Sequence, residues 1–464
     1  MKKLQIAASA LALAGVSTGV AQEKPFTPEK TPPNATPQAA EVKPAASAQP
    51  TLSSTTTNTT SGVNGFLNTR VGEALAKGKF NLNVRPRWEH ADQSNLKESD
   101  AFTIRTRFGY TTAPLEGFQA MLEAENIAVM GPSHNYNAAG TNPNGAGRTV
   151  VADPPTTELN QAWLSYTNWN TLAKVGRQRI ALDNHRFIGD VGWRQNMQTY
   201  DSAVIENKSL PYTTLLYGYL WEVNRVFGDV DRLAPANTDF DSDSHIFHFT
   251  YNHWKWISIN AYSYLLDLEN GVLTNPNSTA TYGAFVNGSV PVHEKVSLDY
   301  RAEFAWQTDY AGNAFDYSTE YYLGELGATI KPVQFGAGYE VLGSDEGSGF
   351  KTPLATLHAH NGWADVFLNT PGREFGAPAG VAGIRDLYAF AGVTLPYEVP
   401  FRVIVHQFRS DSGSVHYGDE LNAVISKKFG KHWTALAKYA HFDGKETPTA
   451  FDVDKIWAQV EFNY

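Results

Sequence analysis

Apolar and polar residues alternate along most of this chain, which indicates β-strands with two different faces. In residues 456–464 every second residue is apolar, and the residues between them are polar apart from Trp457. Because side chains alternate across a strand, one face of this segment is apolar and the other polar. A strand of a soluble sandwich would show this pattern, and so would a lipid-facing barrel strand whose closing aromatic, Tyr464, lies at the membrane interface.

The alternation recurs from residue 79 to the end of the chain and predicts eighteen strands. These are 79–91, 100–112, 117–130, 157–168, 171–180, 198–208, 212–222, 244–253, 255–267, 279–290, 295–308, 319–330, 333–343, 384–395, 400–410, 416–428, 432–442 and 453–464. The count is even, as single-chain bacterial barrels require. The segments near 198 and 319 alternate least clearly, so 16 strands is the alternative. The predicted fold is all-β, a single-chain transmembrane antiparallel barrel over 79–464.

Short and long connections alternate between these strands. The short ones are 113–117, 168–170, 209–211, 252–254, 291–294, 331–332, 396–399 and 430–431, and Pro, Gly and Asn dominate them. The long ones are 131–156, 181–197, 223–243, 268–278, 309–318, 344–383, 411–415 and 443–452. Short periplasmic turns and long extracellular loops are usual in outer-membrane barrels. Both ends of the barrel domain are therefore expected in the periplasm.

The first 21 residues have the features of a secretory signal peptide. Lys2 and Lys3 precede an apolar and small-residue run at 4–20, and cleavage is expected after Ala21. A membrane anchor is the alternative, but the run is short and rich in Ala, Gly and Ser. The mature chain is therefore predicted to be exported, to the cell outer membrane.

Two short regions separate the predicted signal peptide from the barrel. Residues 22–64 are rich in Pro, Ala and Thr, and we expect a disordered periplasmic linker because such a segment buries little apolar surface. Residues 65–78 are expected to form a short helical segment at the periplasmic mouth, ended by Gly78.

Composition narrows the class of protein further. The chain has 11 Trp, 22 Tyr and 25 Phe, yet its mean hydropathy is −0.34, as expected when half of each strand faces a wet lumen. It has no Cys, which excludes disulfides and thiolate metal sites, and its net charge of −10 argues against nucleic-acid binding. The expected partners are outer-membrane lipid and lipopolysaccharide, the outer-membrane assembly machinery, and a transported solute. The oligomeric state is left open.

Basic residues gather on the polar faces of the predicted strands. They are Arg85, Arg87, Arg105, Arg107, Arg301 and Lys438. A charge facing lipid at mid-membrane costs roughly 2–4 kcal/mol, so these residues should face the lumen. Arginine stays charged and matches the geometry of carboxylates, which predicts a lumen that favours anions.

The alternative is that each Arg pairs with an inward carboxylate and only keeps the lumen wet. The candidate carboxylates are Glu89, Glu123, Glu125 and Glu303. This alternative is weaker for the four Arg residues on the first two strands, because one nearby Glu cannot neutralise all four. It would make the protein a general diffusion porin without anion selectivity.

Two of the long connections have unusual composition. Residues 184–195 are polar and carry Arg186 and Arg194, which predicts a charged constriction inside the pore, the alternative being a surface loop. Residues 352–371 are rich in apolar side chains, so we expect this segment to pack against the inner wall as a lid or plug, with a short helix. Its apolar residues are Leu354, Leu357, Trp363, Val366 and Phe367.

The sequence gives little support for a catalytic site or a metal site. His358, His360 and Asp365 include metal-ligating types, but no third strong ligand is nearby, so we expect no metal and no cofactor. The chain has no Gly-x-Ser-x-Gly and no glycine-rich phosphate loop followed by Lys, so no catalytic residue is proposed and the protein is not expected to be an enzyme. A barrel enzyme acting on lipid or glycan remains the distant alternative.

Several short segments together resemble the alginate export family of outer-membrane barrels. They are GRQR at 176–179, NHRFIG at 184–189, WRQN at 193–196, TYD at 199–201, PLATLH at 353–358 and GWAD at 362–365. The resemblance runs from about residue 73 to the end of the chain. It implies an 18-stranded barrel that carries an anionic, alginate-like polysaccharide through an Arg-rich lumen. Its segments also contain Arg177, which joins Arg186 and Arg194 among the expected lumen residues, and His358 and Asp365, which join Trp363 in the expected pore loop.

Overall fold

The computed structural model describes residues 69–228, 239–272 and 274–464. The predicted signal peptide (1–21), the linker (22–64) and the first part of the predicted helical segment (65–78) lie outside the described residues. The helix α2 spans Arg70–Ala76, and the Thr69 side chain accepts a hydrogen bond from the Gly72 amide at 3.0 Å. Among the described residues no helix combines the length and apolar character needed to cross a membrane.

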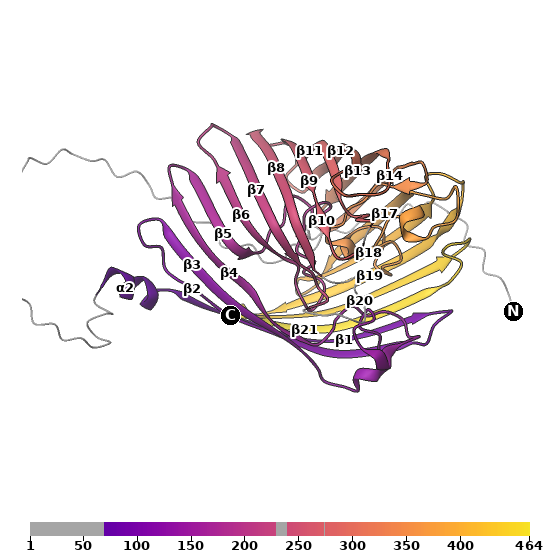
Figure 1. Ribbon diagram of the computed structural model, residues 1–464, viewed down its shortest axis with the longest axis horizontal. Helices are drawn as coiled ribbons and strands as arrows, with labels where there is room; N and C mark the ends of the chain where they lie inside the picture. Colours follow the sequence, from indigo (N-terminus) through magenta and orange to yellow (C-terminus); the bar gives the residue numbers. More distant parts are fainter. Residues whose placement is uncertain (1–68, 229–238, 273) are drawn as a thin grey trace, which may run out of the picture.

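Eighteen antiparallel strands form a closed barrel, in which indigo β1 lies beside yellow β21 (Figure 1). Its strands are β1 (Lys79–Gln93), β2 (Ser99–Thr111), β3 (Phe118–Val129), β4 (Thr156–Asn168), β5 (Thr171–Gln178), β6 (Thr199–Asn207), β7 (Thr213–Asn224), β8 (Phe240–Trp254), β9 (Ile257–Leu266), β11 (Thr279–His293), β12 (Val296–Asp309), β13 (Ser318–Ile330), β14 (Val333–Leu342), β17 (Ile384–Leu395), β18 (Val399–Arg409), β19 (His416–Phe429), β20 (Trp433–Gly444) and β21 (Val453–Asn463). Pairing of β1 with β21, from Asn83 opposite Asn463 to Gln93 opposite Val453, closes the wall.

The remaining elements are short. β10 (Leu268–Glu269) follows β9 and pairs with the start of β8, while β15 (Ser344–Asp345) and β16 (Ser348–Gly349) form a separate small hairpin. Among the described residues, four 3-10 turns lie in long loops, at Ser133–Asn135, Pro143–Gly145, Leu357–Ala359 and Arg373–Phe375. The all-β barrel prediction is confirmed, and the 16-strand alternative is wrong. The largest boundary error is in β8, which begins at Phe240 rather than 244.

Burial follows the predicted alternation along each wall strand. On β1, Trp88 is 37% exposed, whereas its neighbours Arg87 and Glu89 are 1% and 0% exposed. The exposed face is therefore the apolar one, as a barrel surrounded by lipid requires. Exposed aromatic residues also lie where strands meet the short turns, including Trp169, Trp254, Trp433 and Tyr464. This placement is typical of an interfacial aromatic girdle.

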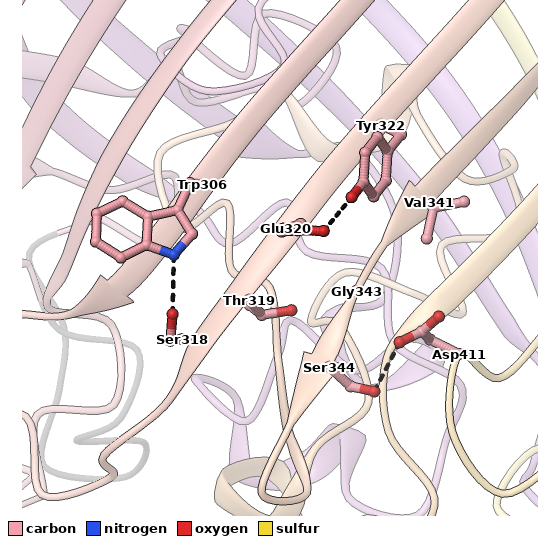
Figure 2. Close-up of a pocket in the computed structure, with 9 residues that line it drawn as sticks. All are labelled: Trp306, Ser318, Thr319, Glu320, Tyr322, Val341, Gly343, Ser344 and Asp411. Atoms are coloured by element: carbon pink, nitrogen blue, oxygen red, sulfur yellow. Dashed lines mark hydrogen bonds between the residues drawn. The ribbon is translucent and has the colours of Figure 1, made fainter.

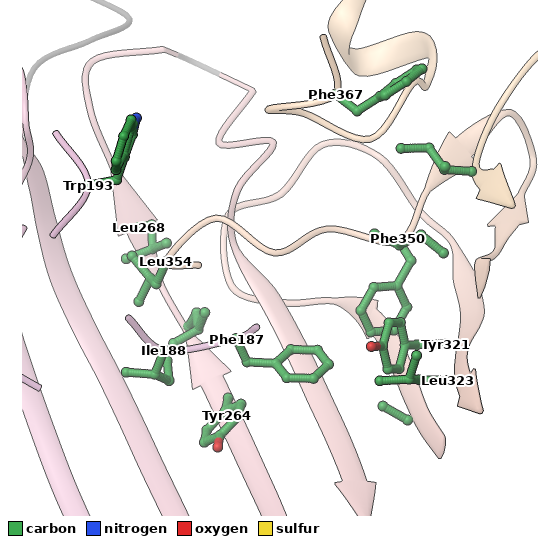
Figure 3. Close-up of a cluster of buried hydrophobic side chains, with 14 of the residues drawn as sticks. Phe187, Ile188, Trp193, Tyr264, Leu268, Tyr321, Leu323, Phe350, Leu354 and Phe367 are labelled. Atoms are coloured by element: carbon green, nitrogen blue, oxygen red, sulfur yellow. The ribbon is translucent and has the colours of Figure 1, made fainter. Parts of the chain in front are cut away.

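The main apolar core of this barrel lies inside the wall, where two long connections enter the lumen. We name residues 179–198, between β5 and β6, the first inserted loop, and residues 343–383, between β14 and β17, the second inserted loop. Figure 3 shows Phe187 and Ile188 of the first loop with Phe350 and Leu354 of the second loop and Tyr321 of β13. The lumen is thus packed by the chain's own loops.

Candidate functional site

The two inserted loops are joined along a line of backbone contacts. The Gly189 amide donates to the Leu354 carbonyl at 2.8 Å, and the Thr356 amide donates to the His185 carbonyl at 3.0 Å. The Thr356 hydroxyl also accepts from the Val191 amide at 3.0 Å. Because backbone bonds of this kind fix both partners, the loops form one inserted unit rather than two separate flaps.

Aromatic packing fixes this unit against the wall. The Phe187 ring lies 5.1 Å from the ring of Tyr262 and 5.4 Å from that of Tyr321, both on inward faces. Phe367 of the second loop lies 4.7 Å from the ring of Phe408 on β18. Leu354 and Phe367 are buried, and Leu357 and Trp363 are partly buried. The structure therefore places the apolar residues of the 352–371 segment inside the barrel, and their role in transport stays a prediction.

Arg85 attaches the first inserted loop to β1. Its guanidinium donates to the carbonyl of Gly192 at 3.0 Å and to that of Trp193 at 3.3 Å, and also to the carbonyl of Arg194. Its Nε donates to Gln195 Oε1 at 2.9 Å. Arg85 is only 1% exposed, so it supports the loop that covers it and does not present a free charge to solute.

The other three arginines of β1 and β2 also have partners. Arg87 donates to Gln459 on β21 at 2.7 Å and approaches Asp153 Oδ2 at 3.7 Å. Arg105 pairs with Glu461 at 3.0 Å, also on β21. Arg107 forms an ion pair with Glu125 on β3. Acids from β21, from β3 and from the connection between β3 and β4 therefore reach three of the four arginines, whereas Arg85 is held by backbone carbonyls and Gln195. The part that the four arginines play in anion selectivity stays a prediction.

Asp365 of the second inserted loop receives three donors. Arg194 Nη2 lies 2.7 Å and Lys455 Nζ 2.9 Å from Oδ2, while His358 Nδ1 lies 2.6 Å from Oδ1. Arg194 in turn makes a two-oxygen contact with Glu89 at 3.0 and 3.2 Å. Both oxygens of the Asp365 carboxylate are thus held by groups from the first loop, the second loop and β21.

The charge state of this network follows from its geometry. His358 Nε2 lies 2.7 Å from Lys438 Nζ, and an ammonium can only donate, so Nε2 accepts and the Nδ1–H donates to Asp365. Burial lowers the pKa of His358 well below its ordinary value, which agrees with a neutral ring. Burial alone would raise the pKa of Asp365, but His358, Lys455 and Arg194 hold it well below its ordinary value. Asp365 is therefore a carboxylate.

Three tryptophans surround the Lys438 ammonium. Its Nζ lies 3.6 Å from the ring centroid of Trp363, 4.2 Å from that of Trp193 and 5.6 Å from that of Trp457. The His358 ring is stacked on Trp193, with centroids 4.5 Å apart and an interplanar angle of 3°. Cation–π contacts of this kind stabilise a charge that has been removed from water. Lys438 therefore contacts residues of both inserted loops from its place on β20.

Two further wall carboxylates, Glu340 and Glu420, hold the inserted unit. Arg186 Nε lies 2.9 Å from Glu340 on β14, and its Nη2 donates to Asn361 at 2.8 Å. Glu420 on β19 accepts from the backbone amides of Trp363 at 2.5 Å and Ala364 at 3.0 Å. The inserted unit therefore spans the lumen from β1 and β21 to β14.

Two further expected lumen groups form local pairs on the inner wall. Arg301 pairs with Glu303 at 2.7 Å and lies 3.8 Å over the Phe285 ring. Glu123 accepts from the Asn160 amide group at 2.7 Å. The Arg301–Glu303 pair matches the alternative in which an inward Arg is balanced by an inward carboxylate, whereas Glu123 is held by side-chain amides.

The prediction for Arg177 is wrong, because this residue faces away from the lumen. It lies on the same face of β5 as Val175, which is 49% exposed, and pairs at 2.7 Å with Asp201 of β6. Asp201 lies between Tyr200 and Ser202, both 0% exposed, so it must point outward. Arg177 therefore belongs to the outer surface of the barrel.

Two other kinds of site come into question, a metal site and a surface pocket. The described ranges contain no group of three or more His, Asp and Glu side chains arranged to hold a metal ion. Figure 2 shows a pocket at the long-loop end of β12 to β14, with Trp306, Glu320 and Tyr322 on its outward side. Trp306 and Tyr322 are 41% and 44% exposed on the lipid-facing side, so this pocket is not the conduction path.

Several residues of the central network were not foreseen from the sequence. Lys455, Glu340 and Glu420 lie on the polar faces of predicted strands, so the alternation could have found them. Asp153 could not be found in this way because it lies in a loop without a period. It is 1% exposed, accepts from the Gln195 amide at 2.8 Å and lies 3.9 Å from Arg194 Nη1.

Comparison with known proteins identifies the family. A family model described as alginate export matches residues 79–447, most of the chain. This chain belongs to the alginate export family. Membership places it among the outer-membrane channel barrels. A search of curated protein sequences gave no match.

Solved structures show the same fold at low sequence identity. OccAB2 of Acinetobacter baumannii has a TM-score of 0.66 at 12% identity, covering 84% of this chain and 98% of its own. OpdK of Pseudomonas aeruginosa, determined with vanillate, has a TM-score of 0.64 at 11% identity, covering 84% and 99%. At such low identity, the likeness to these structures shows only that this alginate export family member has the same fold.

Proposed function

We propose that this barrel is an outer-membrane channel for anionic solutes, including saccharides that carry uronate groups. The observation that carries the proposal is an uneven distribution of charge around the inner wall. On the neighbouring strands β20, β21, β1 and β2, six inward cations face two inward carboxylates. The cations are Arg85, Arg87, Arg105, Arg107, Lys438 and Lys455, and the carboxylates are Glu89 and Glu461.

The other side of the lumen has the opposite balance. On β12, β13, β14 and β17 one inward cation, Arg301, stands among six inward carboxylates. These are Asp299, Glu303, Asp309, Glu325, Glu340 and Asp386. Charge of one sign concentrated on one wall of a narrow passage raises the local concentration of oppositely charged solute. The summed field of these charges thus draws an anion to the β1 side, although the four arginines of β1 and β2 are themselves buried against partners.

Two comparisons support this choice of solute. The family is described by the export of alginate, an anionic saccharide, and OpdK, which has the same fold, was determined with vanillate, a carboxylate. The packed lumen also favours a selective passage over a general diffusion pore, because both inserted loops must be passed or moved by a large solute.

Current block in planar bilayers tests the proposal. An oligouronate added to the refolded barrel should reduce the chloride-carried current, and a neutral oligosaccharide of the same length should leave it unchanged. The neutral sugar controls for size and viscosity, so a difference between the two reports charge. Equal effects of both sugars, or of neither, would identify a general diffusion porin and overturn the proposal.

A further inference from the structure

We propose that the Asp365 carboxylate occupies a carboxylate-binding site, and that the carboxylate of a solute takes its place and releases the second inserted loop. The identity of the solute as a uronate rests on the proposed function. The binding site itself rests on the contacts of Asp365.

The site is built to hold one carboxylate. Arg194 and Lys455 lie 2.7 and 2.9 Å from one oxygen of Asp365, and His358 lies 2.6 Å from the other. Three donors at these distances satisfy a carboxylate in the way that a bound anion would be satisfied. Asp365 itself adopts a left-handed backbone conformation with φ of 61°, just after Gly362 with φ of 86°. A sharp turn therefore presents this carboxylate to the donors.

Two of the three donors to Asp365 lie outside the second inserted loop and would stay in place if that loop moved. Lys455 lies on β21, and Arg194 lies on the first inserted loop, where Glu89 holds its Nη1. If Asp365 withdraws, these two cations and the neighbouring Lys438 and Arg87 remain. The carboxylates Glu89 and Asp153 stay with them, and the wall carboxylates Glu420 and Glu461 act on Lys438 and Arg87.

If Asp365 withdraws, Arg194 Nη2 and Lys455 Nζ lose the carboxylate oxygen that they share. Charges removed from water are costly unless they are paired, so the second loop is held until another anion or bulk water enters. A carboxylate-bearing solute supplies that anion and keeps the donors paired. Trp193 of the first loop and Trp457 of β21 stay near Lys438 when the second loop leaves, and they add apolar faces beside the charged donors, a combination typical of small-molecule sites. A uronate ring has both an apolar face and a carboxylate.

The test measures glucuronate binding to the detergent-folded, full-length barrel by calorimetry, with glucose as the neutral control. In the wild type Asp365 competes with the added carboxylate. The variant Asp365→Ala vacates the site and should bind glucuronate roughly tenfold more tightly or better, because a tethered group competes at millimolar effective concentration. Glu346→Gln, which removes an exposed carboxylate from the same loop, should bind as the wild type does.

Two further variants serve as controls for this test. Adding Lys455→Gln to Asp365→Ala should remove most of the gain, because it deletes a donor to the solute. If Asp365→Ala does not show the heat-modifiable gel migration of a folded barrel, Asp365→Asn keeps the side-chain shape and should shift affinity in the same direction by a smaller factor. Equal glucuronate affinity in the wild type and in the folded Asp365 variant overturns the proposal.

The outcome separates this inference from the proposed function. Selective current block by oligouronate together with unchanged affinity in the Asp365 variant would leave the channel function standing and reject the displacement site. Tighter glucuronate binding by the variant in a barrel whose current no oligouronate blocks would keep the site and reject anion transport.

Discussion

The guanidinium of Arg85 on β1 donates a hydrogen bond to the backbone carbonyl of Arg194 on the first inserted loop. A residue of the lumen wall therefore holds in place the loop that covers it. The same guanidinium reaches the carbonyls of Gly192 and Trp193, so one side chain fixes three successive residues. The basic wall of this barrel thus has a structural task in addition to any effect on solutes.

Replacing Arg85 by Gln should loosen the first inserted loop and raise single-channel conductance. Hydrogen bonds to a charged group contribute about 1.5–3 kcal/mol each, and glutamine cannot reach three carbonyls at once. The barrel should still fold, since lumen positions affect wall stability little. Conductance in planar bilayers is the measurement.

Arg177→Gln is the matched control, because it removes an Arg from the outer surface. It should leave conductance unchanged. If Arg85→Gln also left conductance unchanged in a folded barrel, the loop would be held by its other contacts and the role of Arg85 as its main support would be wrong.

The contact between the two inserted loops can be tested with two glycines of the first loop. A Cβ at Gly189 would lie 2.3 Å from Thr356 Oγ1 and 2.8 Å from its backbone nitrogen, so Gly189→Ala should force the loops apart. A Cβ at Gly192 would meet no atom closer than 3.4 Å, so Gly192→Ala should be accepted. We expect faster proteolytic cleavage within 344–383 for Gly189→Ala. Identical cleavage of the two variants would contradict the tight join of the loops.

Acid should weaken the docking of the second inserted loop. Burial lowers the pKa of His358 and of His360 well below the ordinary value, so the docked loop favours neutral rings. His358 faces Asp365, Lys438 and Arg194. His360 faces two cations, Arg186 and Arg301, and also His185.

Proton linkage gives the direction in which pH changes the docking free energy of the second inserted loop. An undocked histidine binds a proton below about pH 6.5, whereas the docked one does not until lower pH. Docking is therefore strongest above about pH 6.5 and weakens on acidification by at most about 1.4 kcal/mol per pH unit for each histidine. Conductance should rise between pH 7 and pH 5, and His360→Gln should flatten the rise. A conductance independent of pH over this range would show that the loop stays docked.

The strands were predictable because their signal is local. Each wall strand has one face toward lipid and one toward the lumen, so the apolar and polar residues alternate in the sequence. Even the segments near 198 and 319, where the alternation is weakest, form the strands β6 and β13. The same rule placed Arg85, Arg105 and Lys438 inward. The prediction for Arg177 came from the family resemblance and not from the alternation, and it is wrong because Arg177 shares the outer face of β5 with Val175.

The contacts of the inserted loops were beyond the reach of the sequence. Asp153, Gln195 and Asp365 come from three different connections, and no periodicity relates them. Their meeting depends on how far each loop enters the barrel. The composition of 352–371 did predict a packed segment, because its apolar residues had to leave water. It did not indicate that the segment would bind Lys438 and Lys455.

The reversal potential of the refolded barrel across a potassium chloride gradient shows most directly whether the basic side of the lumen makes this channel favour anions. We expect a potential set mainly by chloride. Replacing both Arg105 and Arg107 by Gln should clearly reduce that preference, because Glu461 and Glu125 then lose their cationic partners. A reversal potential set by potassium in the unaltered protein would contradict this anion preference.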